Sequence, residues 1–394
     1  MALCTDRCRN RLADGSVLRA MNAFRCLLGS ITLVALACAG CAAEPGASLP
    51  AKPSAGPLHH AALTRPAGGA WPASVVLADD LADVAGLGSV SQVFDPASGT
   101  LYAMAPVDPH AMGGSWRLEA IRSGSGQVRL GGRYSRPAFL AGGYLWAYDT
   151  QGSARVYQLD PRTLAVVRTI VVTGNPADFN GLYPGTAGSV WTGAGRVLLR
   201  LSARTAAVLG RITLPAGPYP VTDAAVSPDG TVLCVSTGLV GGGGLVRAFS
   251  VATGRLLAVT ARSALTDATT GPGLVAMPGR VWAYFRTGMT GASALLRARD
   301  LAVLKTAVPG TFNGAYEWGQ TGGATDHDGV LWWADGSGLL ACVDPVTGSV
   351  LASETINAPV YQLLGVTDRV YVALNEGVVA ITPPRRCTQA PTIR

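Results

Sequence analysis

Hydrophobic positions in this chain form short runs that alternate with turns rich in glycine, proline and aspartate. An apolar pair whose second member is usually aromatic recurs along the chain: Leu101–Tyr102, Leu145–Trp146, Val190–Trp191, Val232–Leu233, Val281–Trp282, Leu331–Trp332 and Val370–Tyr371. Successive pairs lie about 45 residues apart, a repeat length typical of stacked β-blades. The pattern therefore predicts an all-β protein, a seven-bladed β-propeller.

Each repeat follows the same order of strands and turns. An Asp-Gly turn such as Asp229–Gly230 precedes the apolar pair, and an alternating strand such as Arg155–Leu159 follows it. A second turn, Asp160–Thr163 in this repeat, leads to a last strand, Val166–Ile170. This order predicts a four-stranded antiparallel blade. Because a lone blade cannot bury both faces, we expect the recurring aromatic residue to pack between blades and not to line a ligand cage.

The last repeat is too short for four strands. After 378–381 the chain reaches Pro383–Pro384 without another strand. The apolar segment Ser74–Ala78 precedes the first repeat and can supply the missing strand, which would close the ring and remove exposed sheet edges. We therefore expect the propeller to span residues 73–387, followed by a short tail at 388–394.

The N-terminal region has the sequence features of an export signal. Arg19 and Arg25 precede the apolar run 27–37, and the small residues 39–40 follow just before Cys41. The run is shorter than the roughly 20 apolar residues that a membrane span needs. Residues 1–40 are thus predicted to be a signal peptide, of which 1–20 are an extension upstream of a second start at Met21. The segment 38–41 resembles a bacterial lipobox with Cys38 at the usual aliphatic position, so Cys41 is the predicted lipidation site.

Lipidation would anchor the chain to the outer face of the cytoplasmic membrane; the alternative is an ordinary cleaved signal and a secreted protein. Residues 41–72 are rich in Ala, Gly and Pro and predict a flexible linker. Removing 1–40 takes away five Arg and two Asp, so the net charge falls from +7 to +4. A charge this small argues against nucleic-acid binding.

Composition agrees with a β-rich chain, with 50 Gly, 25 Pro and only 14% charged residues. The excess of Arg, Ala and Gly is typical of high-GC coding, as in actinobacteria. The turn Asp344–Gly348 and the Val-Trp strands resemble those of bacterial YVTN-type and quinoprotein-like β-propellers over residues 73–387. That resemblance implies the fold alone. Leu256 and Val350–Leu351 stand where quinoproteins usually place a docking Trp, so we expect no quinone cofactor.

Three cysteines follow the linker and lie in the predicted propeller or at its end. Export permits a disulfide, and Cys342 with Cys387 is the favoured pair because it would tie down the C-terminus. The alternative is that Cys234 and Cys342 are buried strand residues and that Cys387 is free.

Two near-identical pentapeptides, Phe179–Tyr183 and Phe312–Tyr316, carry the candidate chemistry. We expect them in loops that join an outer strand to the next inner strand, at one mouth of the central channel. The predicted ligand-binding residues are Asn180, Tyr183, Tyr219, Asp223, Asn313, Tyr316, Glu317, Trp318 and Gln320. Amides, phenols and carboxylates suit sugars or other polar ligands. The alternative is a repeated turn with Asn or Gly in a left-handed conformation.

These features favour a lipid-anchored, monomeric binding module for an envelope saccharide or a protein partner, without catalytic residues, metal or cofactor. The alternative is an extracytoplasmic enzyme. A calcium-dependent lactonase or hydrolase would use a ring such as Asn180, Asp223, Asn313 and Glu317, whereas a lyase would use His327. A quinoprotein-like oxidoreductase is a third form of this alternative. Carboxylates or His converging in the channel would favour the enzyme.

Overall fold

A computed structural model describes the propeller region of the chain. The described residues are 71–78, 92–106, 116–123, 125, 127–133, 136–186, 188–216, 221–238, 244–260, 273–287, 290–306, 324–327, 330–334, 338–344, 347, 349–356, 360, 362–366, 369–374 and 377–388. All of them lie in one compact unit, His60–Arg394. The predicted signal peptide, Cys41 and most of the linker lie outside the described residues.

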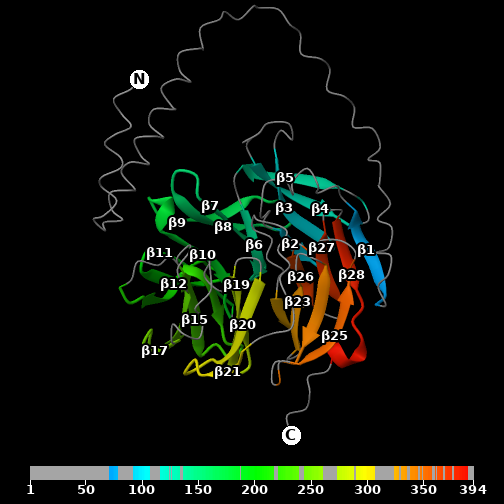
Figure 1. Ribbon diagram of the computed structural model, residues 1–394. Helices are drawn as coiled ribbons and strands as arrows, with labels where there is room; N and C mark the ends of the chain where they lie inside the picture. The colour runs from blue at the N-terminus through cyan, green and yellow to red at the C-terminus, as the bar shows by residue number, and fades with distance from the viewer. Residues whose placement is uncertain are drawn as a thin grey trace, which may run out of the picture. The chain divides into compact units, whose positions relative to one another are not determined.

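The described strands form seven four-stranded antiparallel sheets, which are the seven predicted blades (Figure 1). Blade 1 contains β2 (Gln92–Asp95), β3 (Thr100–Pro106), β4 (Trp116–Arg122) and β5 (Val128–Arg133). Blade 2 contains β6 (Arg136–Ala141), β7 (Tyr144–Asp149), β8 (Ala154–Leu159) and β9 (Val166–Thr173). Blade 3 contains β10 (Phe179–Pro184), β11 (Ser189–Ala194), β12 (Val197–Ser202) and β13 (Val208–Thr213). Blade 4 contains β14 (Val221–Val226), β15 (Val232–Gly238), β16 (Gly244–Ser250) and β17 (Leu256–Val259). Blade 5 contains β18 (Gly273–Met277), β19 (Arg280–Thr287), β20 (Thr290–Arg297) and β21 (Val303–Thr306). Blade 6 contains β22 (Ala324–His327), β23 (Val330–Ala334), β24 (Leu339–Val343) and β25 (Val350–Thr355). Blade 7 contains β26 (Gln362–Val366), β27 (Val370–Leu374), β28 (Gly377–Ile381) and β1 (Ala73–Ala78).

The blades are arranged in a closed ring. The first strand of each blade contacts the first strand of the next, from β2 through β6, β10, β14, β18 and β22 to β26, which contacts β2 again. The core is correspondingly divided into seven apolar clusters, one for each pair of adjacent blades. The recurring aromatic residues Tyr102, Trp146, Trp191, Trp282 and Trp332 are at most 2% exposed. Their predicted role in packing between blades is confirmed.

Blade 7 is built from both ends of the propeller sequence. β1 pairs antiparallel with β28, with Ser74 opposite Ala380. Figure 1 shows blue β1 beside red β28. The prediction that residues 74–78 supply the missing strand is therefore confirmed. Just before β1, the Pro72 carbonyl oxygen accepts a hydrogen bond from the Thr382 N–H at 2.8 Å, which extends this pairing by one residue.

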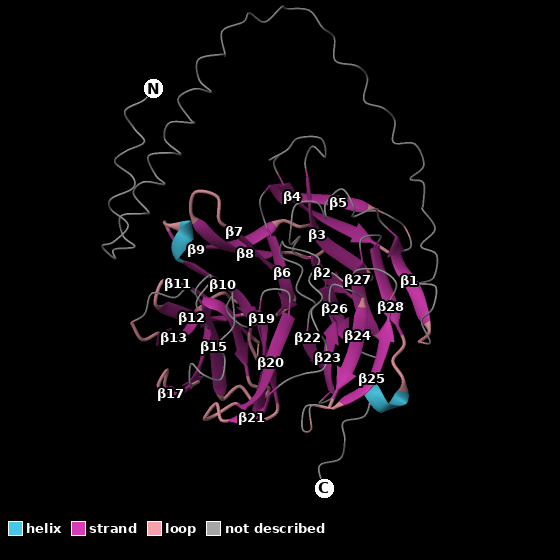
Figure 2. Cartoon of the chain, in the orientation of Figure 1, coloured by secondary structure: helices cyan, strands magenta, loops and turns pink. Residues whose placement is uncertain are grey.

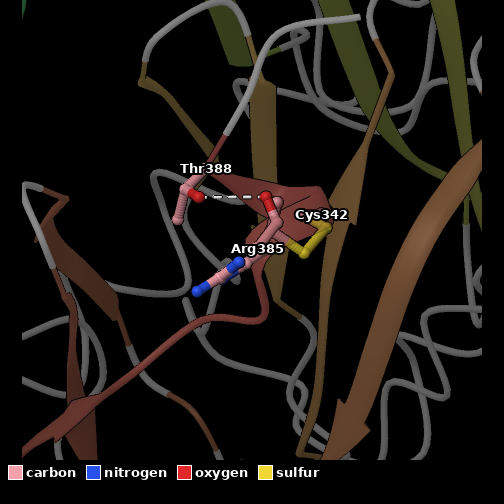
Figure 3. The surroundings of a disulfide bond; sticks show 4 residues. Cys342, Arg385 and Thr388 are labelled. Atoms are coloured by element: carbon pink, nitrogen blue, oxygen red, sulfur yellow. Dashed lines mark hydrogen bonds between the residues drawn. A yellow bond between two sulfur atoms is a disulfide. The ribbon is translucent and has the colours of Figure 1, made fainter.

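A disulfide between Cys342 and Cys387, the favoured pair, links β24 to the short 3-10 helix Arg385–Cys387 (cyan beside β25 in Figure 2). The helix contacts β25, the outer strand of blade 6. Figure 3 shows the bond beside Arg385, whose carbonyl oxygen accepts a hydrogen bond from the Thr388 hydroxyl at 2.9 Å. The C-terminal segment is thus held against one outer strand.

Trp71 belongs to the same apolar cluster as this disulfide, and its ring meets that of Trp332 edge-on at 5.9 Å. The third cysteine, Cys234, is buried and unpaired, and burial raises the pKa of its thiol to about 12. None of the helices among the described residues is both long and apolar enough to cross a bilayer.

Candidate functional site

The predicted pentapeptide Phe179–Tyr183 lies in strand β10, the innermost strand of blade 3, and not in a loop. The expectation of a loop at this position is wrong. The strand forms because Phe179, Leu182 and Tyr183 pair with Ala194, Thr192 and Trp191 of β11. The register of this pairing shifts between Phe179 and Leu182, so Asn180 and Gly181 form a bulge.

The side chains of the pentapeptide stabilise the bulge itself. The Asn180 amide is buried and donates to the Gly195 carbonyl oxygen at 2.8 Å, in the turn between β11 and β12. The Tyr183 hydroxyl donates to the Asn180 carbonyl oxygen, and the Thr192 hydroxyl donates to that of Gly181 at 2.9 Å. Gly181 has φ +91°, the left-handed conformation considered as the alternative. The polar groups of this motif are therefore used within blade 3.

Asp223 lies on β14, the innermost strand of blade 4, and links that blade to blade 5. One carboxylate oxygen accepts from the Leu274 N–H of β18 at 2.7 Å, and the other accepts from the Ala224 N–H at 2.8 Å. Burial raises the pKa of Asp223 to about 7, although both hydrogen bonds act in the opposite direction. The carboxyl therefore changes charge near neutral pH.

Tyr183 and Asp223 are close enough to influence each other. Burial is the main cause that raises the pKa of Tyr183 well above its ordinary value, and the charge on Asp223 raises it further. The structure thus brings together Asn180, Tyr183 and Asp223 on the inner strands of two adjacent blades. The other predicted ligand-binding residues lie outside the described residues: Tyr219, Asn313, Tyr316, Glu317, Trp318 and Gln320.

Within the described part of the chain, no group of three or more His, Cys, Asp or Glu side chains is placed to hold a metal ion. A carboxyl with a pKa near 7 and a neighbouring phenol can exchange or donate protons. Both groups nevertheless hydrogen-bond backbone atoms, Tyr183 within its own blade and Asp223 within its own and the adjacent blade, so the described arrangement is primarily a structural one.

The outer strands differ from the inner strands β10 and β14, because they expose apolar side chains. Every large apolar side chain that is exposed among the described residues belongs to an outermost strand: Val128, Leu130, Val166, Val167, Val171, Val208, Leu209, Leu256, Val259, Val303, Leu304 and Val350. The most exposed are Val171 of β9 at 63% and Val208 of β13 at 60%. Blades 2 and 3 therefore carry the most exposed apolar side chains.

Charge is also distributed unevenly around the ring. Residues 136–213, in blades 2 and 3, contain eight Arg and three Asp, a net charge of +5. Residues 324–355, in blade 6, contain four Asp, one Glu and no Lys or Arg, a net charge of −5. The order of inner-strand contacts places blade 6 three steps from blade 2 in one direction and from blade 3 in the other. The basic and acidic sides are therefore opposite each other.

No protein-family model matches the chain, and no curated protein matches its sequence. Solved structures share its fold. The crystal structure of BamB from Moraxella catarrhalis has a TM-score of 0.50 and 13% identity, covering 75% of this chain and 85% of BamB. The computationally designed protein Ika8 also has a TM-score of 0.50, with 12% identity over 78% of this chain and 98% of Ika8. At this identity the likeness shows a β-propeller fold and carries no activity across.

The exposed apolar side chains of the outer strands were not predicted from the sequence. Val166–Ile170 was expected as the last strand of its blade, and the predicted ligand-binding residues were mainly polar. A signal was present in β9, where every residue except Arg168 is β-branched and the polar-apolar alternation of a half-buried strand is absent.

Proposed function

We propose that this chain is an exported, lipid-anchored β-propeller that binds a protein partner through its outer strands and has no catalytic activity. The observation that carries the proposal is the exposure of Val and Leu on the outer strands, most of all on β9 and β13. Exposed apolar side chains that gather on one part of a soluble domain mark interaction sites. The hydrogen bonds of Asn180, Tyr183 and Asp223 within and between blades support it, because they reduce what the inner strands can offer a small polar ligand.

The anchor part of the proposal rests on Cys41 and the apolar run before it. Lipidation of Cys41 would hold the propeller at the outer face of the cytoplasmic membrane through the linker 42–72. Cys41→Ala is expected to move the protein from the membrane fraction to the medium or the soluble fraction. Retention of this variant in membranes would show that another element anchors it.

Site-specific photocrosslinking in the native host tests the binding role. A photoreactive amino acid is placed at Val167 of β9, at Val208 of β13 and, as the matched position, at Val350 of β25. The proposal expects one discrete protein adduct from the first two positions and none from the third. Equal labelling at all three positions, or no adduct at any, would overturn a binding site on blades 2 and 3.

Asp223 supports a second candidate, an enzyme that uses a carboxyl with a pKa near 7 beside the Tyr183 phenol. In its calcium-dependent form, Asp223 would share the ion with Asn313 and Glu317. Mass spectrometry for metals on protein purified without chelators tests this form. Stoichiometric calcium that disappears in Asp223→Ala would favour the enzyme and overturn the binding-only proposal.

A further inference from the structure

Strand β9 has an unpaired edge. The strand order of blade 2 is β6-β7-β8-β9, and β9 pairs with β8 alone among the described strands. It is eight residues long, Val-Val-Arg-Thr-Ile-Val-Val-Thr, without Gly or Pro. Proteins usually protect such an edge with Pro, Lys, a short strand or a covering segment. A long β-branched edge strand without Pro or Gly is therefore well suited to accept another strand.

The exposed side chains of β9 and of the next blade provide an apolar surface beside this edge. Val166, Val167 and Val171 are 54%, 43% and 63% exposed. β9 contacts β11 of blade 3, and the outer strand of that blade exposes Val208 and Leu209. A strand added to β9 would bury part of this surface, which favours binding by the hydrophobic effect.

Arginines mark the same surface. Arg168 is the one charged residue of β9, and its Nη1 donates to Gln158 Oε1 at 2.8 Å and to the Arg204 carbonyl oxygen of blade 3 at 3.3 Å. Six described arginines on these two blades are exposed, and the eight arginines of 136–213, with only three Asp, give the net charge of +5. A partner strand that carries acidic side chains therefore matches this surface.

The outer strand of blade 6 differs from β9 in its length, in the charge of its blade and in its contacts. β25 is six residues long, lies in the blade with a net charge of −5, and is contacted by the helix Arg385–Cys387 that the disulfide holds. The chain thus places its own C-terminal segment against this strand. No terminal segment contacts β9 to a comparable extent among the described residues.

We propose that β9 accepts, as a fifth strand of blade 2, an extended segment of a partner protein in which Val-like and acidic residues alternate. This inference rests on the proposed function as a protein-binding module and names the partner chemistry. Backbone hydrogen bonds to the free edge supply affinity, and the valines and arginines select the sequence. A second copy of this chain is a poorer occupant, because pairing two β9 strands brings together two surfaces of net charge +5.

The test measures binding of an eight-residue capped peptide of alternating Glu and Val, fluorescently labelled, to the full propeller by anisotropy. The first control peptide replaces Glu with Lys. The second is the Glu-Val peptide N-methylated at alternate residues, which lacks the backbone N–H groups needed to pair with β9. The proposal expects the Glu-Val peptide to bind, and to bind more weakly at high salt. Both control peptides are expected to bind with an affinity at least about 10-fold lower than that of the Glu-Val peptide.

Protein variants locate the site. Val171→Glu on β9 is expected to lower the affinity for the Glu-Val peptide at least about 10-fold, because it places like charges opposite each other on β9 and the paired peptide. Val350→Glu on β25 is the matched control and is expected to change affinity by less than about twofold. Both positions are exposed, and circular dichroism with thermal melting checks that both variants fold.

Three results would overturn the inference: no binding of the Glu-Val peptide, equal binding of the N-methylated peptide, or equal loss in the two variants. A dimer in sedimentation analysis that Val171→Glu dissociates would overturn it in favour of a second copy. If photocrosslinking at Val167 succeeds while the peptide fails, the proposed function stands and the occupant is not an added acidic strand. If crosslinking fails as well, both the proposed function and this inference are overturned.

Discussion

The inner and outer strands of blades 2 to 4 use their side chains in opposite ways. On β10 and β14, polar residues with the chemistry of a ligand site hydrogen-bond backbone atoms of their own or the adjacent blade. On β9 and β13, Val and Leu with the chemistry of a core remain exposed. In this propeller, then, residue type alone does not separate scaffold from surface, whereas position within the blade does.

The difference has a physical origin in the ring. Inner strands of adjacent blades contact one another, so a polar side chain there needs a partner that is close at hand. Adjacent blades diverge with distance from the ring axis, so an outer strand has its edge and part of its faces in solvent. Apolar residues at such positions contribute little to folding and remain available for binding.

The largest effect is expected at Gly181, on the inner side of blade 3. Gly181→Ala places a side chain at φ +91°, and its Cβ would lie 2.5 Å from Tyr183 Oη and 2.8 Å from Cζ. We expect the free energy of unfolding to fall by roughly 2–4 kcal/mol in urea titrations. In a Tyr183→Phe background the additional loss should be smaller, because the closest of these contacts is gone.

Gly210→Ala on β13 is the matched control on the outer side of the same blade. Among the described residues, the atom nearest to its added Cβ is Arg200 Cβ at 4.0 Å, and Gly210 does not have a positive φ. This variant should be neutral or more stable by up to about 1 kcal/mol, since Ala restricts the unfolded chain. Similar losses for the two glycines would contradict the contrast between inner and outer strands.

The sequence was sufficient for the fold because stacking requires periodicity. Blades that bury each other need an aromatic or large apolar residue at the same place in each repeat, and Trp146, Trp191, Trp282 and Trp332 make this repeat visible. Strand β1 could be predicted as well, because the last repeat lacked a strand and the segment before the first repeat offered one.

The site was harder to predict, since its chemistry depends on local geometry. Asn180 appeared to be a ligand residue because nothing in the sequence places the Gly195 carbonyl oxygen 2.8 Å from its amide. Val166 was expected in the last strand of its blade, but its hydrophobicity does not report that its side chain is 54% exposed. A bulge depends on strand pairing and exposure depends on the packing of neighbouring blades, and neither can be read directly from the order of residues.

An intermediate effect is expected at Asp223, and it depends on pH. The unfolded carboxyl has its ordinary pKa of 3.8, whereas the pKa of the folded carboxyl is about 7. Between these values the unfolded state releases a proton that the folded state keeps. The contribution of this group therefore makes the protein less stable as pH rises from about 4 to about 7, and it is constant above that. Tyr183 is the titratable neighbour, and it stays neutral throughout this range.

Asp223→Asn removes this dependence. The Asn side chain can accept only one of the two N–H groups, from Leu274 or Ala224, so the variant should lose about 1–2 kcal/mol near pH 5. The deficit relative to the wild type should shrink as pH rises towards 7, because the wild type alone becomes less stable. Chemical denaturation at a series of pH values measures this difference. A deficit that grows with pH would reverse the assigned direction of the Asp223 pKa.

The smallest effect is expected on the outer side, where a hydroxyl can replace a methyl group at little cost. Val208 is 60% exposed on β13, so Val208→Thr should change the free energy of unfolding by no more than about 0.5 kcal/mol. Val221 of β14 is 8% exposed and belongs to the cluster between blades 3 and 4, so Val221→Thr should cost about 1–3 kcal/mol. Paired urea titrations compare the two substitutions directly. An equal cost would mean that the outer valines are part of the core that holds the blades, which would remove the main support for a binding surface on blades 2 and 3.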